Sequence, residues 1–121
     1  MKWDDDIEDL IQSQLFGAIR LFRHEKNENA TWGRLYEIAV AILEPYRDYG
    51  VVVDFKVVCD DRVNNQEALD ENVLNMQVGL KTETGARFRP YHFSLILDGI
   101  GTALLIPPDL IEKDCDFVNE V

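Results

Sequence analysis

Residues 50–80 contain two stretches of alternating side chains, and this pattern predicts a β-sheet at the centre of the fold. In the first stretch one face is apolar, formed by Val51, Val53, Phe55, Val57 and Cys59. In the second stretch the apolar face is formed by Leu74, Met76, Val78 and Leu80. Alternation with a period of two is typical of strands that bury one face. Because Val52 and Val58 lie among polar residues on the other face, we expect that face to be partly covered.

The connector between these strands is rich in aspartate and asparagine. Cys59–Asp61, Asn64–Asn65 and Leu69–Asn72 carry the short polar side chains that turn and cap a backbone. The calcium-loop spacing that would make the aspartates a metal site is missing. We therefore interpret the connector as structural loops, and we expect neither a metal nor another cofactor.

Two amphipathic helices are predicted before the sheet. The first follows the acidic triplet Asp4–Asp6, which suits a helix N-terminus. Its apolar stripe is formed by Ile7, Leu10, Ile11, Leu15, Ala18, Ile19 and Phe22. The second is expected to be capped by Asn29 or Thr31, and it buries Trp32, Leu35, Tyr36, Ile38, Ala39, Ile42, Leu43 and Tyr46. Pro45 predicts a kink or an early end near Leu43.

A third strand is predicted over residues 88–97, after a hairpin loop at 81–87. Residues 102–106 form a short apolar run between Gly101 and Pro107. This run has two interpretations of equal weight: a strand given to the sheet of a neighbouring subunit, or a fourth strand of its own sheet. The predicted fold is α+β, with two helices packed on a mostly antiparallel sheet of three or four strands. We expect residues 1–98 to form the domain and residues 99–121 a C-terminal arm.

Charge limits the classes of partner. The 121 residues carry a formal net charge of −11, and the pI is about 4.4. A nucleic-acid-binding protein needs a basic face, so we expect no nucleic-acid partner. The same charge disfavours anionic membranes, whereas a basic protein partner is compatible with it. Residues 1–6 do not resemble an apolar leader, and no stretch reaches membrane-spanning length.

Residues suited to catalysis are sparse, and we expect no enzymatic activity. The two histidines, His24 and His92, have no orienting partner nearby in the sequence. Cys59 precedes two aspartates, which raise the pKa of a thiol and so oppose a role as nucleophile. Cys59 and Cys115 have no metal-ligand spacing, and an intracellular, reduced protein is expected.

Three short motifs occur in order along the chain. The first is Asn27–Trp32, an asparagine followed by Thr-Trp at the start of the second helix. The second is Tyr49-Gly50 followed by the strand and Cys-Asp of Phe55–Asp60. The third is the asparagine-rich turn at Asn64-Asn65, followed by Ala68–Leu74. With these motifs, residues 22–97 resemble the C-terminal domain of the sheath proteins of contractile tails, which are found in bacteriophages and related injection machines.

The resemblance implies a structural protein of the virion, without cofactor. Sheath proteins are longer and carry further domains before this one. The helix that Pro45 interrupts in this chain is usually unbroken in the family. We therefore expect a small sheath-like ring subunit at the neck, the collar or another end of the sheath, assembled in the host cytoplasm. The implied partners are other copies in a ring, expected to be a hexamer, together with tail sheath and tail tube or neck proteins.

In this family, subunits interlock by adding terminal strands to a neighbour's open sheet edge. The expected interface lies in the C-terminal arm and consists of Thr102, Ala103, Leu104, Leu105, Ile106, Leu110, Ile111, Phe117 and Val118. Because exposed apolar residues favour aggregation, we expect a neighbour to cover most of them. The alternative function is a small acidic binding protein, such as a chaperone or inhibitor, that forms no ring.

Overall fold

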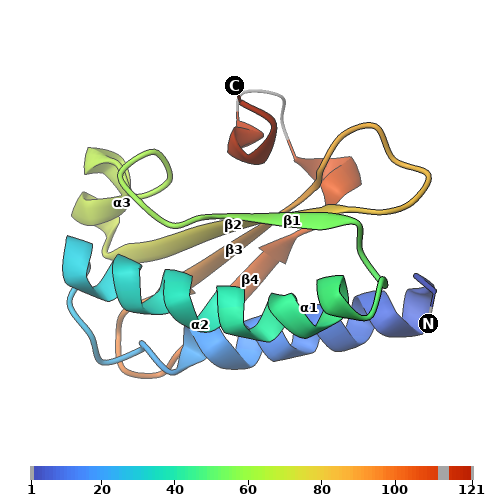
Figure 1. Ribbon diagram of the computed structural model, residues 1–121. Coiled ribbons are helices and arrows are strands. Elements are labelled where there is room, and N and C mark those ends of the chain that lie inside the picture. The colour runs from blue at the N-terminus through green and yellow to red at the C-terminus, as the bar shows by residue number, and fades with distance from the viewer. Residues whose placement is uncertain (1, 112–114, 121) are drawn as a thin grey trace.

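The computed structural model describes residues 2–111 and 115–120. Two helices lie side by side on one face of a four-stranded antiparallel sheet, which confirms the predicted α+β class (Figure 1). The strand order is β1-β2-β3-β4, so each strand pairs with its neighbour in the sequence. The elements are α1 (Asp5–Arg20), α2 (Asn29–Asp48), β1 (Asp54–Val58), α3 (Gln66–Glu71), β2 (Val73–Lys81), β3 (Arg89–Ile96), β4 (Ala103–Ile106) and the 3₁₀ turns η1 (Pro108–Leu110) and η3 (Phe117–Asn119).

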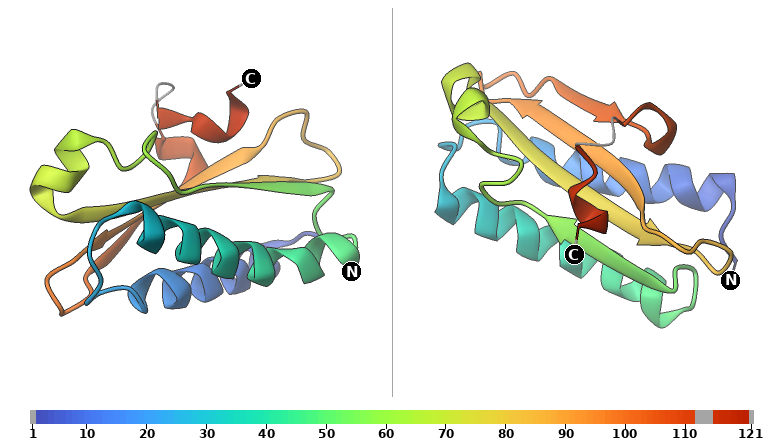
Figure 2. Two further views of the ribbon diagram at one scale, coloured as in Figure 1. Left: turned by 60° about the vertical axis from the view of Figure 1, so that its left-hand side comes forward. Right: turned by 90° about the horizontal axis from the view of Figure 1, so that it is seen from above.

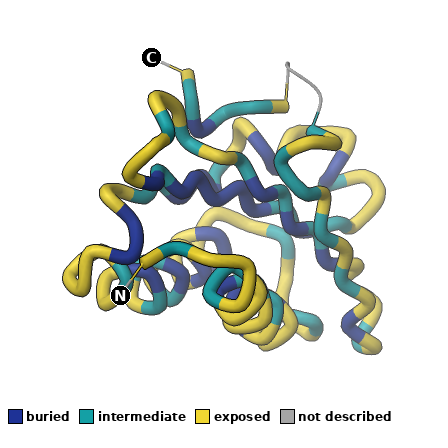
Figure 3. Tube along the Cα trace, turned by 90° about the vertical axis from the view of Figure 1, so that its right-hand side faces the viewer, coloured by how far each residue is buried: buried dark blue, intermediate teal, exposed yellow. Residues whose placement is uncertain are grey.

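The hydrophobic core lies between the sheet and the two long helices. The two central strands place their apolar residues opposite one another, with Met76 beside Phe93 and Val78 beside Tyr91. From the helices, Ile11, Leu15, Leu35, Ala39 and Leu43 are buried against this layer. Figure 3 shows the result as buried backbone along the central strands and exposed backbone on the outer side of the helices. The predicted strands at 73–80 and 88–97 are thus found within a residue or two of their expected ends.

The first helix begins as expected, but the second neither begins nor ends as predicted. The N-cap of α2 is Glu28, which makes no side-chain capping bond, so the predicted cap at Asn29 or Thr31 is wrong. The Asp4 carboxylate accepts a hydrogen bond from the Ile7 amide at 2.8 Å and caps α1. The predicted end of α2 near Leu43 is wrong, because this helix continues through Pro45 to Asp48. Pro45 cannot donate to the carbonyl of Ala41, but both residues are exposed, so water can satisfy that carbonyl.

The entrance to α2 is tied to the sheet through a motif residue. The Trp32 indole donates to the Asn27 side chain at 2.6 Å, and Asn27 donates to the carbonyl of Val73 at 2.8 Å. Trp32 is buried, as predicted. The Asn27–Trp32 motif therefore has a structural role here, since it joins the start of α2 to the start of β2.

The first strand is shorter than predicted. It begins at Asp54, and Val51 and Val52 before it are both buried in an irregular segment that has no alternation. Phe55 is only half-buried, whereas its place on the apolar face of the predicted strand led us to expect that it is largely buried. The reason is that β1 is an edge strand, so the ring lies at the rim of the sheet, where the Arg47 guanidinium stacks on it at 4.6 Å.

Part of the connector is helical, which the sequence analysis did not predict. Asn65 caps α3 by accepting from the Ala68 amide at 3.1 Å, and Asn72 ends it with a left-handed backbone (φ 55°). Asparagine is favoured in both roles because its side chain bonds locally and its backbone tolerates positive φ. The Asn72 side chain also donates to the carbonyl of Leu97 at 2.9 Å, which fixes α3 at the end of the sheet.

Candidate functional site

The face of the sheet that points away from α1 and α2 is a grid of outward side chains, and we call it the second face. Its rows follow from the strand register. One row joins Val73 to Ile96, the next joins Asn75, Ser94 and Leu104, the third joins Gln77, His92 and Ile106, and the last joins Gly79 to Pro90. Half of these residues are polar or glycine and half are apolar, as expected for a face that is only partly covered.

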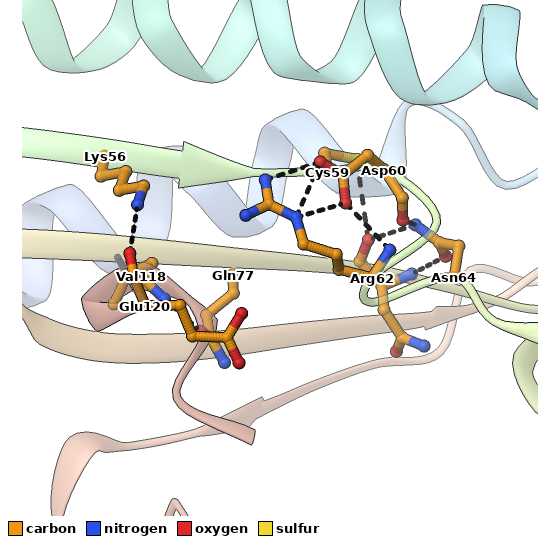
Figure 4. Close-up of polar contacts among 9 residues, drawn as sticks. Lys56, Cys59, Asp60, Arg62, Asn64, Gln77, Val118 and Glu120 are labelled. Carbon is orange, nitrogen blue, oxygen red and sulfur yellow. Dashed lines mark hydrogen bonds and ion pairs between the residues drawn. The ribbon is translucent and has the colours of Figure 1, made fainter. Parts of the chain in front are cut away.

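Residues 115–120, which we call the C-terminal segment, cover Gln77 of the third row and Gly79 of the fourth, whereas Ile106 of the third row stays exposed. Gln77 is 0% exposed, and its side-chain oxygen accepts from the Val118 amide at 3.0 Å (Figure 4). The Gln77 amide donates to the carbonyl of Cys115. Val118 is buried against Val58 and Val63 in a second, smaller core. The buried side-chain amide of Gln77 therefore finds its hydrogen-bond partners in the C-terminal segment.

The C-terminal segment also approaches the β2–β3 hairpin closely. The Asn119 side chain accepts from the Phe88 amide at 3.0 Å and donates to the Phe88 carbonyl at 2.8 Å. Arg87 pairs with Asp116 at 2.9 Å. A Cβ placed on Gly79 would lie 2.8 Å from the Cβ of Val118, so glycine is required for this contact.

We expect Gly79→Ala to displace the C-terminal segment and to lower the free energy of unfolding by about 1–3 kcal/mol, the usual cost of overpacking. Urea melts of the full chain measure this loss. The same substitution in a chain that ends after Pro107 serves as the control, because the clash with Val118 is then absent and only the contact with the Phe88 Cβ at 2.9 Å remains, so we expect a smaller loss there. Equal losses in both backgrounds would show that Val118 is not the cause.

The connector is fastened to β2 by a network of amides. Asn64 is buried; it accepts from the Asn75 amide at 2.8 Å and donates to the Asn75 carbonyl at 2.9 Å. The Asn75 side chain accepts from the Ser94 hydroxyl at 2.6 Å. These bonds hold the loop after β1 against the second face, so the asparagine-rich turn of the third motif is structural in this chain.

The ionisable groups near the connector are held in inert states. Arg62 forms an ion pair with Asp60 at 2.7 Å, and this hydrogen bond lowers the pKa of the Asp60 carboxyl. Burial, with a smaller contribution from Asp60, raises the pKa of the Cys59 thiol to about 12. The thiol therefore stays protonated at neutral pH and is a poor nucleophile. Burial also favours the neutral form of His92 and so lowers the pKa of its imidazole. The Nδ1 atom of His92 has no hydrogen-bond partner among the described residues.

The edge of the sheet at β4 is open. The amide of Ile96 donates to the carbonyl of Thr102 at 3.0 Å, so the alternate positions Leu104 and Ile106 bond to β3. The backbone groups of Ala103 and Leu105 then point away from the sheet. The edge ends at Pro107, which has no amide hydrogen. Within residues 2–111 and 115–120 the amides of Ala103 and Leu105 have no backbone partner, so the edge offers a short row of unpaired donors and acceptors.

The structure resolves the two interpretations of residues 102–106, because β4 pairs antiparallel with β3 of the same chain. The expected boundary at residues 98 and 99 therefore falls between two strands of one sheet. Leu105 and Val118 are covered by this chain itself, contrary to the expectation that a neighbour covers them. Of the predicted interface residues, Thr102, Leu104, Ile106 and Leu110 are exposed, Ala103, Leu105, Ile111 and Phe117 are half-buried, and Val118 is buried.

In comparisons with known proteins, no family model, curated protein or solved structure matches this chain. Within residues 2–111 and 115–120, no three His, Cys, Asp or Glu side chains are grouped so that they could hold a metal ion. None of the helices in this part of the chain has the length and apolar character needed to cross a membrane. The candidate functional site is accordingly a surface: the β4 edge with the exposed residues beside it on the second face.

Proposed function

We propose that this chain is a sheath-like structural ring subunit of a contractile tail, located at the neck, the collar or another end of the sheath. The observation that carries the proposal is the open β4 edge, where the outward amides of Ala103 and Leu105 lie beside the exposed side chains of Leu104 and Ile106. Such an edge accepts an additional strand through backbone hydrogen bonds, while the apolar side chains beside it add burial.

The pairing of β4 within its own sheet changes the part that this strand plays in the proposal. It receives a strand from a neighbour, either another copy of this chain or a sheath subunit. The edge is short, so each contact is weak, and closure of a ring is what makes a set of weak contacts stable. The role needs no catalytic group and no cofactor.

Light scattering of the purified protein, alone and mixed with tail sheath protein, tests the proposal. We expect a ring-sized particle, or incorporation into sheath, with the wild-type chain. Ala103→Pro removes an outward donor at the edge without touching the ladder to β3, and we expect it to abolish the assembly. Ala103→Ser keeps the amide and is the matched control.

A chain that stays monomeric and ignores sheath would contradict the ring role. That outcome would favour the alternative, a small acidic binding protein that works as a monomer or dimer. Assembly that is unchanged in Ala103→Pro would show that the ring forms through another surface.

A further inference from the structure

The described residues leave part of the second face uncovered, between α3 at one end of the sheet and the C-terminal segment over its middle (Figure 2, right). The uncovered part consists of two rows of the grid: Val73 with Ile96, and Asn75 with Ser94 and Leu104. Leu104 is 60% exposed and Ile96 is 38% exposed. An apolar strip therefore lies open along one side of a polar floor.

A groove of about 520 Å³ runs over this floor. One wall is α3, which contributes Glu67, Ala68 and Glu71, and the opposite wall includes Phe117 of the C-terminal segment. Because Glu67 and Glu71 are four residues apart on one helix, their carboxylates lie on the same side of it. Ile96 and Leu104 do not line the groove but border it, because the register places them next to Val73 and Ser94, which do. A partner lying in the groove would therefore meet two carboxylates along one rim and the exposed apolar strip beside it.

The charge of the groove is not balanced by its own residues. The lining cation, Arg62, is engaged by Asp60 at 2.7 Å. Among the described residues, neither Glu67 nor Glu71 forms an ion pair. Phosphate-bearing partners, whether nucleic acid or anionic lipid, would be repelled by such a rim, whereas lysine or arginine would be attracted.

The geometry also limits the backbone of an occupant. The hydrogen bonds of a sheet lie in its plane, so a strand lying flat on the second face finds no backbone partners there. A helix satisfies its own backbone and needs only side-chain contacts, as α1 and α2 do on the other face. We propose that this groove binds a cationic amphipathic helix of a partner protein. Its apolar side packs on Val73, Ile96 and Leu104, and its lysine or arginine side chains pair with Glu67 and Glu71.

This proposal does not depend on the ring role, and a binding measurement on the unassembled protein tests it. The probe is a fluorescein-labelled synthetic peptide of leucine and lysine alone, arranged as an amphipathic helix, and fluorescence anisotropy gives its Kd. We expect the double variant E67Q/E71Q to weaken binding about tenfold, because two exposed charge pairs are lost. We expect Leu104→Ser to weaken it about fivefold, because an apolar contact is lost.

Matched controls separate groove binding from general attraction to a chain of net charge −11. The double variant E37Q/E44Q removes two exposed carboxylates from α2, on the other side of the sheet, and changes the net charge equally. Leu21→Ser changes an exposed leucine at the end of α1. We expect both controls to alter Kd less than about twofold. Equal losses in test and control variants, or no binding of the wild-type chain, would overturn the proposal.

Discussion

A chain that ends after Asp98 is expected to lose its cooperative fold. The deletion removes β4, whose Ala103 and Leu105 side chains pack on the main core, and it exposes the β3 residues beneath them. It also removes Val118 from the smaller core. The lost burial of Leu105 and Val118 costs about 1.5–3 kcal/mol for each side chain, and each lost hydrogen bond between β3 and β4 costs about 1 kcal/mol. Together these give a loss of roughly 5–10 kcal/mol in the free energy of unfolding. This is comparable to the whole stability of a typical domain, about 5–15 kcal/mol.

Circular dichroism in a urea titration measures this loss, and a chain that ends after Pro107 is the control. The longer chain keeps β4 and loses the C-terminal segment. Its Gln77 side chain then meets water, so we expect a loss of only about 2–3 kcal/mol, mainly from Val118, and a transition that stays cooperative. If the chain of residues 1–98 melts like the full chain, β4 contributes nothing to its own sheet. Its interpretation as a strand given to a neighbour would then be correct.

The elements that could be predicted from the sequence are those whose pattern is long and local. The strand at Val73–Lys81 alternates over nine residues, and α1 repeats its apolar positions over four turns. The short α3 has too few residues for a helical period, and its two capping asparagines are equally typical of turns. The continuation of α2 past Pro45 depends on the exposure of the Ala41 carbonyl to water. The local sequence does not show whether that carbonyl is exposed.

The candidate site was less predictable because it depends on pairings between distant residues. The composition of residues 102–106 suits an edge strand of either sheet, so the sequence could not show which sheet contains it. The groove exists because the register aligns Asn75, Ser94 and Leu104, and because Val118 covers the neighbouring rows. The alternation of β2 predicts that Gln77 points away from the core. Its hydrogen-bond partners, Cys115 and Val118, lie about forty residues further along the chain and could not be predicted.

Two phenylalanines, one in the inner strand β3 and one in the edge strand β1, are expected to differ strongly in their contribution to stability. Phe93 is 0% exposed in the middle of the sheet, between Met76 of β2 and Leu105 of β4. Its ring meets Phe16 of α1 edge to face at 5.4 Å. Phe93→Ala therefore leaves a cavity that is enclosed on every side, and we expect a loss of about 3–5 kcal/mol.

Phe55 is the matched comparison, because it also lies in a strand but at the rim of the sheet. Water can fill the space that Phe55→Ala leaves, and the main partner of the ring is the exposed Arg47 side chain. We expect a loss of about 1 kcal/mol, the scale of a partly exposed aromatic and cation–π contact. Urea melts of the two variants measure the difference directly. Equal losses would mean that β1 is more deeply covered in solution than the rim position of Phe55 implies, for example by a partner at that edge.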